Sequence, residues 1–152
     1  MKPSALFTPL PITLSLLLAA YTHTAHSHSA GAVLDPAGNN PSFTALAEIT
    51  CFNDGNGDPD HLFADVQDLS SPFPDLLVNV QLYKGNQAIN ITDPYSGDGA
   101  PSPAIKLQGG AGVYRILVNK TGLGPRAFEV TWHCETADGT HTGTDIVVRQ
   151  FE

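Results

Sequence analysis

The sequence has little cysteine, little positive charge and no apolar run long enough to cross a membrane. Its 152 residues include two cysteines, and seven Lys and Arg stand against fifteen Asp and Glu. A chain this acidic is poorly suited to bind nucleic acid or an anionic membrane surface, so cations or basic partners are expected instead. The longest apolar stretch, residues 12–20, is well short of the ~20 residues that a membrane span needs.

The N-terminus has the pattern of a signal peptide. Lys2 supplies a positive start, residues 12–20 read ITLSLLLAA, and small polar residues follow. We assign residues 1–27 to the signal peptide, with a cleavage site between residues 20 and 30, and expect export to the periplasm or the extracellular space. A first helix of the folded domain is the alternative, which Pro9 and Pro11 disfavour.

Removing the leader takes away one basic residue and no acid, so the mature chain has a net charge near −9 with neutral His. Two cysteines in an exported chain predict a disulfide between Cys51 and Cys134. Closing so long a loop stabilises a fold by roughly 4–5 kcal/mol in the chain-entropy description. A pair of metal thiolates or free thiols is the alternative, although two cysteines are too few for a zinc site.

Residues 28–42 are rich in Gly, Pro and Asn, and we expect a flexible lead-in there. From Phe43 apolar residues recur at every second position, which places Ile49 and Cys51 on the inward face of a strand. About seven short strands separated by turns follow, and no amphipathic helical window occurs. We therefore predict one all-β domain over residues 43–152, an antiparallel β-sandwich.

The number of strands and the long-range cysteine pair resemble an immunoglobulin-like architecture. The resemblance is limited to architecture, because Trp132 and Cys134 share one strand, whereas antibody domains place these residues on different strands.

The last two strands, residues 127–135 and 145–151, can be aligned by their turn. A three-residue loop that ends at Gly139 in the left-handed conformation turns Ile146 and Val148 toward the core. The same register places Glu135 opposite His141.

That register predicts an outward cluster of His133, Glu135 and His141. Imidazole and carboxylate groups suit first-row metals and proton transfer, so a half-exposed zinc, copper or proton site is one hypothesis. The alternative is a cross-strand charge pair worth less than ~1 kcal/mol on a solvated face.

An acidic loop offers a second candidate cation site. Its oxygen-bearing side chains recur at every second position and end eleven residues after the first, at Asp54, Asn56, Asp58, Asp60 and Asp65. This spacing partly resembles a calcium-binding loop, but Pro59 stands where such a loop requires Gly. A plain acidic turn is the alternative.

The third candidate depends on where the leader is cut. Cleavage after Ala25 leaves His26-Ser27-His28 at the N-terminus, a set suited to Cu(II) or Ni(II). Cleavage after Ser27 fits the preference for small residues better and makes His28 the terminal residue, which can chelate copper through its amine and ring. A cut elsewhere leaves an ordinary tail.

No catalytic motif is evident, and we do not expect an enzyme. The sequence predicts an exported, disulfide-linked binding module whose ligand is copper or calcium. A structural or recognition domain for protein or glycan, without a metal, is the alternative. Asn90 and Asn119 begin glycosylation sequons, which matter only in a eukaryotic source.

Overall fold

The computed structural model describes residues 28–152 of the chain; the predicted signal peptide and His26 lie outside this part. The described residues form nine strands and no helix, so none of their segments is a helix that could span a membrane. The strands are β1 (His28–Leu34), β2 (Thr44–Phe52), β3 (His61–Asp68), β4 (Val78–Lys84), β5 (Gln87–Thr92), β6 (Ile105–Gln108), β7 (Gly112–Lys120), β8 (Arg126–Glu135) and β9 (His141–Phe151).

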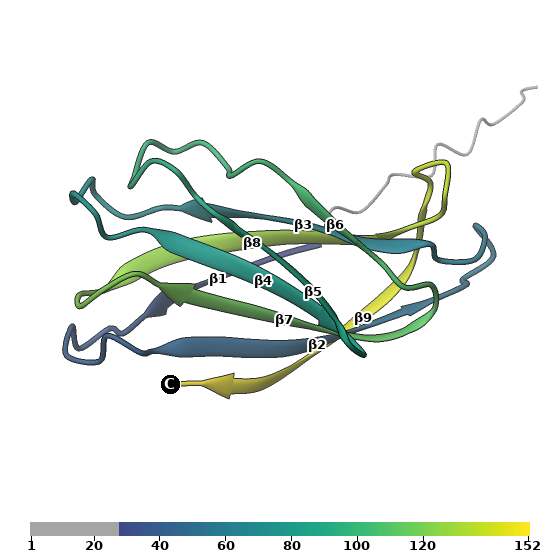
Figure 1. Ribbon diagram of the computed structural model, residues 1–152, viewed down its shortest axis with the longest axis horizontal. Helices are drawn as coiled ribbons and strands as arrows, with labels where there is room; N and C mark the ends of the chain where they lie inside the picture. Colours follow the sequence, from purple (N-terminus) through teal and green to yellow (C-terminus); the bar gives the residue numbers. More distant parts are fainter. Residues whose placement is uncertain (1–27) are drawn as a thin grey trace, which may run out of the picture.

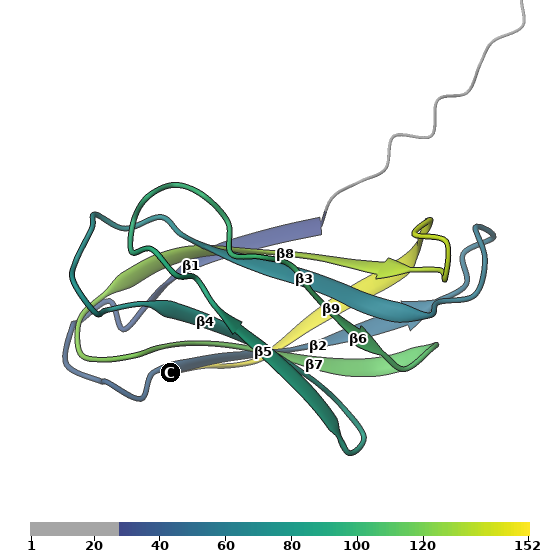
Figure 2. The same ribbon diagram turned by 45° about the horizontal axis from the view of Figure 1, so that its top comes forward.

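The strands follow one hydrogen-bonded path in the order β5-β4-β7-β2-β9-β8-β3-β6, and β1 pairs with β8 outside this path. Every pairing between these strands is antiparallel, and the two ends of the path, β5 and β6, contact each other. Figures 1 and 2 show the result as two facing layers that β9 joins. The predicted all-β antiparallel class is confirmed, in a nearly closed, barrel-like form with nine strands rather than about seven. The immunoglobulin-like architecture stays a prediction.

Strand β1 lies within residues 28–42, where the sequence predicts a lead-in without strands. Only Leu34 of this strand is buried, so β1 lacks the alternating apolar pattern that would have predicted it. Backbone pairing with β8 holds it instead, from His28 opposite Trp132 to Leu34 opposite Arg126. A side-chain carbon at Gly31 would lie 2.9 Å from the carbonyl oxygen of Phe128, so the close approach of the two strands requires glycine there.

The predicted disulfide between Cys51 and Cys134 is confirmed. It joins β2 to β8, and therefore the two layers, across a sequence separation of 83 residues. Both cysteines are buried, as are Ile49 and Trp132 beside them, which confirms the predicted inward faces of the two strands. The disulfide therefore crosslinks the two layers inside the apolar core.

Two buried ion pairs involve the last residue of β7 and the first residue of β8. Lys120 Nζ lies 3.0 Å from an oxygen of Asp35, and Arg126 Nη1 lies 3.3 Å from an oxygen of Asp68. Burial raises the pKa of Asp35, but hydrogen bonds from Lys120 and from backbone amides outweigh it and lower the pKa to about 2. The Asp35 carboxylate therefore stays ionised inside the fold near pH 7.

The predicted turn between β8 and β9 forms as its sequence indicates, since Gly139 has a φ of 85°. Glu135 lies opposite His141, so the predicted register of the last hairpin is confirmed.

The prediction for the end of this hairpin is only half right. After Thr142, β9 leaves β8 and pairs with β2. Ile146 consequently packs against the core, whereas Val148 is 65 % exposed rather than inward. Since β9 diverges from β8 while β1 follows it, a cavity of about 130 Å³ lies between β1 and β9, with an apolar lining that includes Ala32 and Ile146.

Candidate functional site

Three strands meet at the end of β8. Strand β1 begins opposite Trp132 and β9 begins opposite Glu135, while β3 runs along β8 from Asp68 to His61. Because β3 occupies one edge of β8, β1 and β9 share the other edge, and His133 lies between their points of attachment. The first described residue, His28, is therefore placed at this fork.

His133 and His141 form the centre of the site. Their rings are stacked with centroids 4.1 Å apart, and the ring of Phe63 lies 5.4 Å from that of His133. His133 points away from the core, as predicted, but the prediction of a half-exposed position is wrong because it is 9 % exposed. The alternation of residues along a strand predicts which face a side chain lies on, but not how deeply it is buried. His133 is buried because the rings of Phe63 on β3 and His141 on β9 pack against it.

The surroundings of His133 favour its neutral form. Burial lowers the pKa of His133, and the charges of His141 and His28 lower it further, although Glu135 acts in the opposite direction. The effect of His28 on this pKa reflects its position at the fork, where its ring also lies 6.2 Å from the ring of Trp132.

Glu135 is the second buried group, at 7 % exposure instead of the half-exposed position predicted for the cluster. One carboxylate oxygen lies 2.8 Å from His61 Nε2 and 2.9 Å from Lys106 Nζ. The other lies 3.7 Å from His141 Nε2. Burial raises the pKa of Glu135, but the hydrogen bonds from Lys106 and His61 outweigh it, so the pKa is lowered overall.

His61 and Lys106 are site residues that the sequence did not reveal. They come from β3 and β6, and their register against β8 depends on pairings between segments far apart in the chain. His61 Nδ1 also lies 2.9 Å from an oxygen of Asp60. Both ring nitrogens thus face carboxylates, an arrangement in which both can donate only when the ring is protonated.

Two nitrogens of the site have no partner among the described residues. Nδ1 of His133 and Nδ1 of His141 are buried and make no hydrogen bond there. Buried polar atoms in folded proteins are nearly always hydrogen-bonded, so two such atoms on stacked rings call for an explanation. A ligand that accepts lone pairs from imidazole would satisfy both.

The acidic loop does not present its oxygens to one point. An oxygen of Asp54 accepts a bond from the amide of Asn56, and an oxygen of Asp58 accepts one from Asn53. Asp60 belongs to the His61 network, and Asp65 lies inside β3 opposite Thr131. The structure therefore gives the calcium prediction no coordinating set.

Within residues 28–152, no group of three or more His, Cys, Asp or Glu side chains is arranged to hold a metal ion. The chain matches no known family model, and neither a curated protein nor a solved structure is significantly similar to it.

Proposed function

We propose that the mature protein is an exported binding module that holds one Cu(II) ion at the fork of β8 and has no catalytic activity. The observation that carries the proposal is the pair of buried, unpartnered Nδ1 atoms on His133 and His141, next to the residue at which β1 begins. Imidazole nitrogens are good ligands for Cu(II).

Processing would supply the remaining ligands. Cleavage after Ser27 makes His28 the N-terminal residue and gives it a free amine. Because side chains alone do not complete a metal site in the described part of the chain, the new amine is the decisive addition. Amine and imidazole nitrogens together form a set typical of tetragonal Cu(II).

The protonation states of the site suit a cation. The lowered pKa of His133 keeps its ring neutral near pH 7, and a metal-binding histidine must be neutral. The Glu135 carboxylate faces Nε2 of His141 at 3.7 Å, which leaves Nδ1 of that ring for a ligand. A carboxylate behind a ligating histidine fixes its tautomer and orientation in many metal sites. His61 and Lys106 hold Glu135 in turn.

Two further features agree with this function. The disulfide is consistent with an oxidising compartment outside the cytoplasm. The net charge near −9 of the mature chain favours the approach of cations. Cleavage after Ala25 instead would create the His26-Ser27-His28 terminus, whose amine and backbone amides bind Cu(II) without His133 or His141.

The test is a Cu(II) titration of two purified chains that differ by one residue. One begins at His28 and the other at Ser27, and intact mass of the secreted protein identifies the natural start. We expect one ion per chain in the first form and an affinity lower by roughly tenfold or more in the second.

The second part of the test measures Cu(II) binding by two variants of the chain that begins at His28, His133→Gln and His141→Gln. Each should weaken binding and change the electron paramagnetic resonance spectrum of the bound ion. Equal affinity for the chains starting at His28 and Ser27, or binding that neither substitution alters, would refute the proposal.

A further inference from the structure

The six basic residues of the described chain fall into two groups. Lys120 and Arg126 are buried and pair with buried carboxylates, and Lys106, although its side chain is 49 % exposed, pairs with the buried carboxylate of Glu135. The other three, Lys84, Arg115 and Arg149, line a single surface cleft of about 720 Å³. The three basic residues that have no buried acid as a partner are thus gathered at one place.

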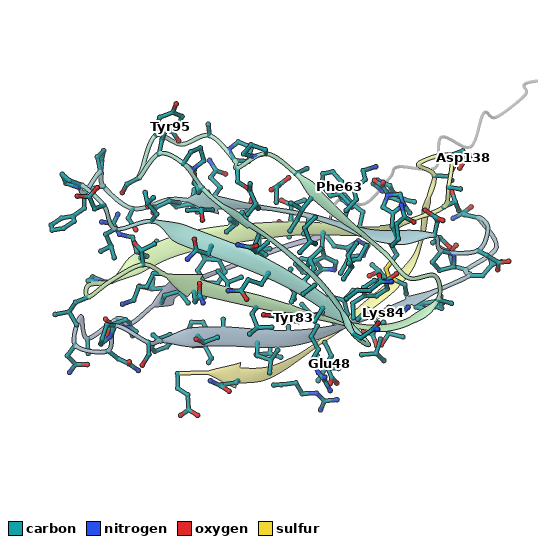
Figure 3. All side chains as sticks on the ribbon, viewed as in Figure 1. Glu48, Phe63, Tyr83, Lys84, Tyr95 and Asp138 are labelled. Atoms are coloured by element: carbon teal, nitrogen blue, oxygen red, sulfur yellow. A yellow bond between two sulfur atoms is a disulfide. The ribbon has the colours of Figure 1, made fainter. Side chains whose placement is uncertain are left out.

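The cleft lies on the outer face of the layer that contains β4, β7, β2 and β9, away from the copper site proposed above. Figure 3 shows Glu48, Tyr83 and Lys84 on this side of the molecule. Arg115 lies directly opposite Glu48 in the pairing of β7 with β2, and Arg149 comes from β9. Regular strands therefore set the spacing of the charges.

One carboxylate holds both arginines. Glu48 lies 2.7 Å from Arg149 Nη2 and 3.5 Å from Arg115 Nε, and the hydrogen bond from Arg149 is the main reason why the pKa of Glu48 is lowered. Glu48 is the one acid in the lining, so two guanidinium groups share a single negative charge. Their side chains are 63 % and 53 % exposed for Arg115 and Arg149, which leaves donors available to a further anion.

Lys84 adds a third charge at the rim. Its ammonium group donates hydrogen bonds to the carbonyl oxygens of Gly110 and Ala111, at 2.8 Å and 2.7 Å, and lies 4.0 Å from the centre of the Tyr114 ring. These neutral partners fix its position without cancelling its charge.

The rest of the lining is largely apolar. Leu46, Val113 and Leu117 stand beside the charged groups, and Val113 is half exposed. A free anion or a sulfated sugar would gain little from these aliphatic side chains. A peptide that combines carboxylates with aliphatic residues would match both parts of the surface.

We infer that this cleft is a docking surface for an acidic, partly aliphatic segment of another protein, with Arg115 and Arg149 as the carboxylate-binding pair. The inference does not depend on the copper proposal, because no residue of the cleft belongs to the fork of β8. The net negative charge of the chain repels an acidic partner at long range, but salt screens that repulsion beyond about 10 Å near 0.1 M. Binding is then decided by the local charges.

The test uses fluorescence anisotropy with a fluorescein-labelled decapeptide of Asp, Glu and Leu. Its counterpart with Asn and Gln in place of the acids is the reference probe. We expect the acidic probe to bind and the reference probe not to bind. Arg115→Gln and Arg149→Gln should each weaken binding about five- to tenfold, because each removes a charge-assisted contact.

Ala100→Glu is the matched control. It changes the net charge by the same amount as Arg149→Gln, at an exposed position of the loop between β5 and β6. This variant should bind the acidic probe as wild type does, and circular dichroism melts confirm that all variants fold. Equal weakening by Ala100→Glu would show that only net charge matters and would overturn the inference.

A polysaccharide is the competing partner class. Heparin that binds more tightly than the acidic peptide, with the same dependence on Arg115 and Arg149, would overturn the assignment to a protein segment. Absence of binding to the acidic probe at low salt would overturn it as well.

Discussion

Removing the disulfide tests how much of the fold depends on the link between the two layers. Cys51 and Cys134 are 83 residues apart, and a loop of this size corresponds to about 4.5 kcal/mol of stabilisation in the chain-entropy description at 25 °C. Replacing both by alanine should lower the free energy of unfolding by this amount. For a domain of about this size the midpoint of thermal unfolding should fall by about 15–20 °C.

Urea unfolding followed by tryptophan fluorescence measures the effect directly, since Trp132 is the single tryptophan of the chain and is 3 % exposed. Far-UV circular dichroism gives a second probe of the same transition. Wild type reduced with dithiothreitol is the matched control, because it loses the bond and keeps both sulfur atoms. Its stability should be close to that of the double variant.

The two single cysteine variants test whether the lost stability comes from the disulfide itself. Either substitution breaks the same bond, so Cys51→Ala, Cys134→Ala and the double variant should be destabilised about equally. A loss below about 1 kcal/mol in the double variant, or single losses that add up, would show that the bridge does not act through the unfolded chain. Cys134 lies between His133 and Glu135, so we also expect weaker copper binding in any variant that still folds.

Three other predictions concern the buried polar groups and the first strand. Arg126→Met leaves the Asp68 carboxylate without its buried partner and should destabilise the protein by about 3–5 kcal/mol in urea unfolding, whereas Arg126→Lys should be milder. The pKa of Asp35, about 2 in the fold against 3.8 for an ordinary aspartate, means that its contribution to stability is complete above pH 3.8 and is lost as the pH falls toward 2. The free energy of unfolding measured across this range should therefore depend less on pH in Asp35→Asn than in wild type. The same dependence on pH in both proteins would contradict the lowered pKa of Asp35. Gly31→Ala would place a methyl group against the Phe128 carbonyl, so the amides of β1 should exchange with deuterium faster while those of β2 do not change.

The parts of the fold that the sequence predicted depend on local signals. Gly139 and the alternation of apolar residues were sufficient to fix the register that places Glu135 opposite His141. The inward position of Cys51 and Cys134 followed from the same alternation. Short-range turn chemistry and the two-residue period of strands carry this information.

The parts that it missed depend on contacts between distant segments. Strand β1 has one buried residue, Leu34, and exists because β8 offers an unpaired edge. His61 reaches Glu135 through a pairing of β3 with β8 that no turn specifies. The burial of His133 depends likewise on Phe63 from another strand. Neither pairing leaves a pattern in the sequence next to the residues concerned.

Strand β1 is hydrogen-bonded to one neighbour only, β8, and this affects its sensitivity to proteolysis. A strand bound along one edge, with one buried side chain, is expected to open in local fluctuations before the doubly paired strands do. An ion that joins the N-terminal amine to His133 and His141 would suppress that opening in proportion to its concentration. In the chain that begins at His28, resistance of residues 28–34 to an aminopeptidase would then show whether copper is bound.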